Sequence, residues 1–389
     1  MDRSKITLTV AGVLFFFTPY HPQPVWPLYI KQEGFGIGAV GLLLSLYPLA
    51  LIISRIPIGV LADRLVGKRR LLISLGFALM AFGSILPPVI GGLAGIIASR
   101  LILGLGAGFY VAFAIIYSSY FPATSLRRSI MVAAAFFGLG QLVATPSGGF
   151  LGETVDILAP FWTSAAAALL GAFLSFSIRE PELAPIKGAV LLKNSQLYLA
   201  SFLMMIIFFT VYATVYSLSQ IFAEDLGATK VDQGLLLFTY LAVFCLITLL
   251  VAPSLSDKIG LPLTILLGMG FVGLGAGLVP TSTMVTLYAS EALIGLGLGL
   301  SFGLLMAMSV ENVSEGQRFS AMGIFQFAYA IGIFAGPAVG AQIADGFSTA
   351  AAFYTSVAVI AFGAAVLLAY MQLERIHKQI GISVAEKLP

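Results

Sequence analysis

Charged residues are scarce in this chain of 389 residues: Asp, Glu, Lys and Arg make up 10% of it, whereas 59% of the residues are hydrophobic. A soluble domain has about 25% charged residues. A chain with a mean hydropathy of +1.02 cannot cover its surface with polar side chains, so lipid must be the solvent for most of that surface. The composition therefore excludes an ordinary water-soluble protein.

Residues that build redox, metal and nucleotide sites are also few. The single cysteine, Cys245, has no partner for a disulfide within the chain and is expected to be a small buried hydrophobe. The two histidines, His21 and His377, show no zinc-ligand spacing, and the phosphate-binding pattern G-x-x-x-x-G-K-[S/T] does not occur. We expect no metal, no cofactor, no nucleic-acid partner and no direct use of ATP.

Long apolar runs fill most of the sequence instead. A bilayer core about 30 Å thick requires roughly 20 apolar residues per helix. The runs that satisfy this length are 6–30, 38–62, 69–90, 93–120, 128–151, 158–178, 196–223, 231–255, 262–280, 283–310, 317–344 and 348–373. The pattern predicts an all-α polytopic membrane protein with twelve spans, the first of which is a retained helix and not a cleaved signal peptide.

The only long polar stretch divides these spans into two sets of six. It predicts an N-terminal bundle over 1–178, a cytoplasmic linker over 179–195, a C-terminal bundle over 196–374 and a tail over 375–389. Most of the 20 Lys and Arg residues fall in the tails and the even-numbered loops. This positive-inside bias predicts a multi-pass protein of the cell membrane with both termini in the cytoplasm.

The two halves repeat each other in sequence. The segment Ala98–Gly108 resembles Ala289–Gly299, which lies 191 residues later. The same offset relates Arg127 to Arg318, Pro146 to Pro337 and Gly149 to Gly340, while Asp63-Arg64 is matched by Asp257-Lys258. Two repeated bundles about an axis normal to the membrane are one of the known transporter plans.

Several motifs in these repeats resemble the major facilitator superfamily. Residues 59–70 are similar to its loop G-x-L-A-D-R-x-G-x-K/R-R, with one extra residue before Gly67. Arg100 with Gly104, Gly106 and Gly108 resembles its fourth-helix motif R-x-x-x-G-x-G, although Leu103 stands where glutamine is usual. Residues 332–340 resemble G-x-x-x-G-P-x-x-G, and residues 140–149 resemble an imperfect form of that exporter-associated pattern.

The resemblance implies two pseudo-twofold-related six-helix bundles and a conformational latch. Gly59 would let helices pack closely, and Asp63 would bind the amino end of a helix in the other half, stabilising the outward-open state. The remaining latch and gate residues would brace it and face anionic lipid: Arg64, Gly67, Lys68, Arg69, Asp257, Lys258, Arg127 and Arg318. The alternative is a basic loop that only sets topology.

Small residues and prolines inside the spans are interpreted as packing and hinge positions. Glycine allows backbones to approach closely, and proline bends a helix whose freed carbonyls neighbours can satisfy. These positions are Gly104, Gly108, Pro146, Gly149, Gly295, Gly336, Pro337 and Gly340.

Two charged residues lie at matching places inside spans, Arg100 and Glu291. A charge at mid-helix costs about 2.5–3.5 kcal/mol on insertion scales, so such residues are functional candidates. Glu291 is the leading candidate for a carboxylate that loads and releases a proton. Arg100 could bind an anionic substrate or act as countercharge to Glu291; a structural ion pair, or side chains that reach the interface, would explain both residues as well.

The resemblance implies that spans 1, 4, 7 and 10 line a central cavity, and polar residues of the first and seventh spans complete this candidate site. Tyr20 and His21 lie in a proline-rich break, where His21 could relay protons or be merely interfacial. Tyr212, Tyr216 and Gln220 recur every four residues and could contact substrate, although core packing would also explain them. Arg55 is expected to reach the cytoplasmic interface.

These features predict a secondary active transporter and not an enzyme. We expect a monomer that exports a small amphipathic compound in exchange for protons by alternating access. The alternative is an importer, proton-coupled or facilitative, of a small organic anion held by Arg100. A remote alternative is a membrane sensor or an intramembrane enzyme, for which no nucleophile–base pair is evident.

Overall fold

The structure is a computed structural model that describes residues 3–65, 67–120, 126–179, 194–313 and 318–380. The regular elements within these ranges are all helical. The latch and gate side chains of Asp63, Arg64, Arg127 and Arg318, and the surroundings of Gly59, lie outside what is described.

Helices of the first half begin and end close to the expected spans. In chain order they are α1 (Arg3–Tyr20), α2 (Trp26–Gln32), α3 (Ile37–Arg64), α4 (Arg69–Ile90), α5 (Gly92–Gly108), α6 (Tyr110–Ser119), α7 (Leu126–Thr154) and α8 (Ala159–Phe176). The first expected span is broken between α1 and α2, because Pro22 and Pro24 lack the backbone N–H that a continuing helix needs.

The second half follows the same plan. Its elements are α9 (Ser195–Ala213), the π-helix η2 (Thr214–Leu218), α10 (Ser219–Asp225), α11 (Lys230–Leu246), the π-helix η3 (Ile247–Val251), α12 (Ala252–Ile259), α13 (Leu261–Leu278), the 3₁₀ turn η4 (Val279–Thr281), α14 (Met284–Glu311), α15 (Arg318–Gly346) and α16 (Thr349–Ile380). Side chains cap several helix starts: Asn194 accepts from the backbone of Leu197, and Thr229 forms a capping box with Asp232.

Apolar composition and length make these helices membrane spans. Among the described residues, 9 helical segments are long and apolar enough to cross a bilayer, and Ile6–Tyr20 and Gly92–Gly108 are shorter apolar helices. The predicted all-α polytopic architecture is confirmed.

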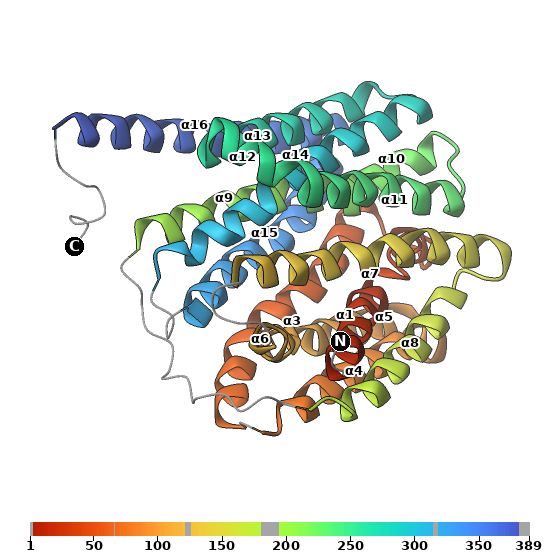
Figure 1. Ribbon diagram of the computed structural model, residues 1–389. Coiled ribbons are helices and arrows are strands. Elements are labelled where there is room, and N and C mark those ends of the chain that lie inside the picture. The colour runs from red at the N-terminus through yellow and green to blue at the C-terminus, as the bar shows by residue number, and fades with distance from the viewer. Residues whose placement is uncertain (1–2, 66, 121–125, 180–193, 314–317, 381–389) are drawn as a thin grey trace.

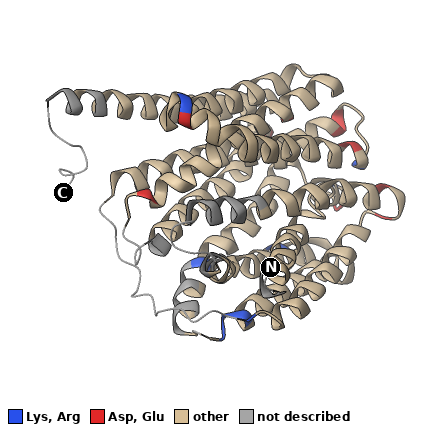
Figure 2. Ribbon diagram, in the orientation of Figure 1, with Lys and Arg blue, Asp and Glu red and all other residues tan. Residues whose placement is uncertain are grey.

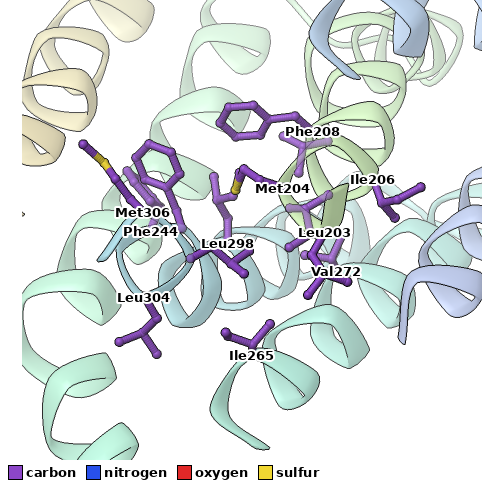
Figure 3. Packing of buried hydrophobic residues seen from close by; sticks show 14 of the residues in the cluster. Leu203, Met204, Ile206, Phe208, Phe244, Ile265, Val272, Leu298, Leu304 and Met306 are labelled. Atoms are coloured by element: carbon purple, nitrogen blue, oxygen red, sulfur yellow. The ribbon is translucent and has the colours of Figure 1, made fainter. Parts of the chain in front are cut away.

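Each half has its own core, and the halves lie side by side (Figure 1). One apolar cluster joins α1, α3, α4 and α5 around Phe15 and Phe77. The other joins α9, α11, α13 and α14; Figure 3 shows Phe208, Phe244 and Leu298 of three helices directed toward one another. The most extensive contacts between halves are made by α3 with α15 and by α7 with α11.

Among the described residues, charged positions gather toward the two ends of the helices, and the ribbon between them is mostly uncharged (Figure 2). At one end, two ion pairs connect the halves: Lys31 with Glu224, and Lys230 with Glu153 at 3.6 Å. We call this end the ion-pair face, and the end where α3 stops and α4 starts the opposite face. At the opposite face Arg69 is fully buried, so it does not face lipid headgroups as expected from the sequence, whereas Lys68, Asp257 and Lys258 are exposed.

Glycines stand where helices approach each other most closely. A Cβ atom added at Gly104 or Gly295 would lie 2.2 Å from the carbonyl oxygen of Tyr47 or Tyr240, respectively. The expected packing glycines Gly108, Gly149, Gly336 and Gly340 likewise face neighbouring helices at Ser54, Lys230, Phe209 and Ala213. Pro337 lies inside α15, where its carbonyl oxygen faces Gly41 of α3, and Pro146 lies inside α7 beside Gly234 of α11.

Candidate functional site

The break between α1 and α2 directs the neighbouring side chains of Tyr20 and His21 toward different helices. Tyr20, the last residue of α1, faces the other half, and its hydroxyl lies 2.6 Å from the hydroxyl of Tyr212. His21 is 1% exposed and faces α7 and α8 of its own half. The proline-rich segment therefore brings Tyr20, but not His21, to the boundary between the halves.

Both ring nitrogens of His21 have partners. Nδ1 lies 2.9 Å from the carbonyl oxygen of Ala144, and because a carbonyl only accepts, Nδ1 carries the hydrogen. Nε2 lies 2.8 Å from the hydroxyl of Thr163, from which a neutral imidazole accepts. The ring also stacks on Phe17 at 4.5 Å between centroids. These contacts fix the imidazole in place, and its expected part in proton relay remains a prediction.

A small enclosed cavity lies between the halves, next to Tyr20. Its volume of about 20 Å³ has room for about one water molecule. Its wall is aromatic and apolar apart from Arg100 and Gln23, and consists of Pro19, Tyr20, Gln23, Leu44, Tyr47, Pro48, Arg100, Tyr212, Tyr216, Ile333 and Pro337. These residues come from α1, the α1–α2 break, α3 and α5 of the first half and from α9, η2 and α15 of the second.

Tyrosine hydroxyls connect the halves across this cavity. In addition to the Tyr20–Tyr212 bond, the hydroxyl of Tyr216 donates to Oε1 of Gln141 at 2.6 Å. Gln23 donates to the backbone oxygen of Tyr216 at 3.2 Å, and the Tyr212 and Tyr216 rings stack at 4.5 Å. The structure thus brings together the predicted residues Tyr20, Tyr212 and Tyr216.

Arg100 supplies the positive charge of the cavity. Its guanidinium carbon lies 5.2 Å from the ring centroids of both Trp26 and Tyr47, and the group donates to the backbone oxygen of Leu44. The side chain is 5% exposed and Nε has no hydrogen-bond partner. Arg100 forms no ion pair with any Asp or Glu that the structure describes, so the expected alternative of a structural pair with Glu291 is wrong.

Glu291 lies away from the cavity wall, inside the second half. It is 0% exposed on α14, and neither carboxylate oxygen has a hydrogen-bond partner of ordinary geometry. Ser219 lies beside the carboxyl group, and Tyr216 and Tyr240 are close enough to interact with its charge. A carboxyl group buried without hydrogen-bond partners is costly, and the cost is greatest when the group carries a charge.

Gln220 does not line the cavity, contrary to its expected place in a stripe with Tyr212 and Tyr216. Its Nε2 donates to the backbone oxygen of Val215 at 3.0 Å, and its own backbone oxygen accepts from Gln233 at 3.1 Å. The reason is the π-helix η2, whose wider turn rotates every later residue relative to an α-helical stripe.

The position expected for Arg55 also differs from the one that the structure shows. It is 8% exposed and contacts α15 of the other half, where Nη1 donates to the backbone oxygen of Gln326 at 2.7 Å and Nη2 to the hydroxyl of Tyr329 at 3.3 Å. The expectation that it extends to the membrane interface is wrong, because α15 covers this side of α3. Sequence reasoning also missed Gln23, Tyr47 and Gln141, whose only signal is a polar atom on an apolar helix.

Comparison with known proteins agrees with this architecture. The family model of the Major Facilitator Superfamily matches residues 8–217 and again 200–386. An uncharacterized MFS-type transporter of Methanocaldococcus jannaschii is 23% identical over 94% of this chain and 96% of its own length. The inner membrane transport protein YajR of Escherichia coli is 26% identical over 39% of this chain and 33% of its own length.

A solved structure shows the same fold. The crystal structure of the human organic anion transporter MFSD10 (TETRAN) superposes with a TM-score of 0.72 at 16% sequence identity, covering 94% of this chain and 99% of that one. With two matched copies of the family model spanning nearly the whole chain, the protein belongs to the Major Facilitator Superfamily and is a multi-pass membrane transporter.

Proposed function

We propose that this secondary transporter carries small amphipathic organic anions, which bind at Arg100 in the cavity between the halves. The observation that carries the proposal is a buried guanidinium with no described carboxylate partner. An uncompensated charge in the membrane is costly, and a bound anion would neutralise it. The fold that this chain shares with an organic anion transporter supports the same substrate class.

The rest of the wall favours a substrate with an apolar or aromatic body. Tyr47, Tyr212 and Tyr216 present ring faces and hydroxyls, and Leu44, Ile333 and the prolines present apolar surface. A cavity with room for about one water does not hold such a substrate, so the halves must move apart to admit it. Alternating access provides that movement.

We further propose that Glu291 couples transport to protons. Its burial without hydrogen-bond partners favours the protonated form, and movement of α14 that exposes it to water would favour release. On this proposal the basic opposite face lies in the cytoplasm together with both termini, and the protein functions as a monomer in the cell membrane.

Efflux of an uncharged amphipathic compound in exchange for protons is the second candidate. The observation in its favour is that Arg100 is the only charged residue of the cavity wall among the described residues. In that case Arg100 would act on Glu291 through its charge and would not bind the substrate.

Flux in proteoliposomes separates these candidates. The wild type, Arg100→Lys and Arg100→Gln would be compared with Arg179→Gln, which removes a charge from the exposed Arg179. We expect uptake of radiolabelled benzoate or octanoate, but not of benzamide, to fall at least 10-fold in Arg100→Gln and less in Arg100→Lys, because a charge-assisted hydrogen bond contributes about 1.5–3 kcal/mol. Equal loss of benzamide transport would favour the uncharged substrate. Imposing a proton gradient in either direction shows whether protons move with the substrate or against it.

A further inference from the structure

Arg55 is a second buried guanidinium without an ion-pair partner among the described residues. It contacts α15 only through the backbone oxygen of Gln326, the hydroxyl of Tyr329 and the face of the Tyr329 ring, 5.0 Å from the guanidinium carbon. Its Nε has no hydrogen-bond partner. A carbonyl and a phenol leave the positive charge uncompensated, so this position is costly unless it serves binding.

Arg55 and Arg100 belong to one electrostatic environment. The Arg100 guanidinium carbon lies 5.2 Å from the centroid of the Tyr47 ring, and Arg55 follows Tyr47 on the same helix by about 12 Å of helical rise. Arg100 is fixed to Leu44 of α3, and Arg55 follows Leu44 on the same helix by about 16 Å of helical rise, in the direction of the opposite face. Two like charges therefore flank Tyr47, and an anion near this ring would be attracted by both.

We propose that Arg55 is a second anion-binding residue, to which the substrate passes from Arg100 on its way to the opposite face. The proposal rests on the proposed function, since it assigns a further residue to the same anionic substrate. At this position the anionic group replaces the carbonyl of Gln326 and the hydroxyl of Tyr329 as the partner of Arg55. An ionised acceptor forms the stronger hydrogen bond, so the exchange is favourable.

The exchange has a mechanical consequence, because the contacts that Arg55 gives up connect α3 of the first half to α15 of the second. Nearer the ion-pair face the same two helices remain in contact, with Gly41 against the carbonyl oxygen of Pro337 and Gln342 donating to Gly38 at 3.1 Å. Substrate at Arg55 would therefore release α3 from α15 at the opposite face and leave the ion-pair face closed. The anion thereby opens its own exit or entrance.

A thiol beside Arg55 tests this. Gln326 bonds to Arg55 through its backbone oxygen and its side chain is 4% exposed, so Gln326→Cys in a Cys245→Ser background keeps the contact and places a buried thiol at the junction. Labelling by a water-soluble maleimide would be measured on the purified full-length protein with sodium benzoate, sodium octanoate or benzamide. The parent with Arg55 intact would be compared with Arg55→Lys, Arg55→Gln and the control Arg179→Gln, and thermal stabilisation by each compound would be measured for all of them.

We expect benzoate or octanoate, but not benzamide, to increase labelling several-fold in the parent and in Arg179→Gln. In Arg55→Gln the anion should no longer change labelling, and its apparent affinity should fall about 10-fold, with partial recovery in Arg55→Lys. An anion response in Arg55→Gln equal to that of the parent would overturn the inference, as would a labelling increase that benzamide produces equally. If Arg100→Gln still loses anion binding in that case, the proposed function stands; if no anion stabilises the wild type, both fail.

Discussion

Lys31 and Glu224 form an ion pair across the two halves although 193 residues separate them in the chain. Their side chains remain 29% and 38% exposed. Together with Lys230 and Glu153, they hold the ion-pair face closed in this conformation. A partly exposed pair of this kind contributes about 0–1 kcal/mol, enough to bias a conformational equilibrium without dominating stability.

Charge reversal at this pair should open the ion-pair face. In Lys31→Glu, two carboxylates repel each other, and we expect labelling of a thiol at Gln23→Cys (Cys245→Ser background) to rise several-fold, since Gln23 is 7% exposed below the pair. The exchanged pair Lys31→Glu with Glu224→Lys should restore low labelling. High labelling in both variants would show that the pair does not hold this face.

Glu291→Gln should abolish proton-driven transport while the protein still folds. Glutamine has the shape of the protonated acid but cannot release a proton, and no described hydrogen bond of the carboxylate is lost. We expect the midpoint of thermal unfolding to change little, and flux driven by a proton gradient to disappear. The control is Glu311→Gln, at an exposed glutamate of the same helix. Proton-driven flux at the wild-type level would refute the assignment.

The Tyr20–Tyr212 hydrogen bond should be measurable as a coupling energy. Tyr20→Phe and Tyr212→Phe each remove one hydroxyl of a 2.6 Å bond between halves. Each single change should cost about 1 kcal/mol, and the double change should cost little more than one of them. A double-mutant cycle of unfolding in detergent checks this. Additive costs would mean that the hydroxyls act separately.

Gly104→Ala should destabilise the first half. Its added Cβ would lie 2.2 Å from the carbonyl oxygen of Tyr47, so α5 must move away from α3. We expect a loss of about 1–3 kcal/mol, the usual cost of overpacking, and weaker anion binding because Arg100 lies on the same helix. Gly270→Ala is the matched control, since no atom lies within 4 Å of its added Cβ. Equal stability of the two variants would contradict the packing.

Hydropathy and charge were sufficient to predict the helices, because lipid imposes length and apolarity on every span. Charge inside a span selected Arg100, and the proline-rich break, the four-residue spacing and the family resemblance selected Tyr20, Tyr212 and Tyr216; the structure brings all four to one cavity. They failed where local geometry departs from the α-helix: the π-helix after Ala213 turns Gln220 away from the cavity.

The sequence also could not show which helices pack against each candidate residue. Arg55 was expected at the membrane interface because its distance from the helix end can be counted, whereas the position of α15 over that surface cannot. The same limit applies to Glu291 and Arg100. Their matching positions in the repeat suggest an ion pair, but Arg100 is buried against Trp26 in the first half and Glu291 is buried near Ser219 in the second.

The contacts across the axis differ in what they require of the two repeats. A hydroxyl can both donate and accept a hydrogen bond, so the Tyr20–Tyr212 contact could form even if the two bundles were identical. An ion pair needs two opposite charges, so the Lys31–Glu224 contact requires different residues at the paired positions of the two bundles. The contribution of this ion pair to closing the face therefore depends on divergence between the repeats at these two positions.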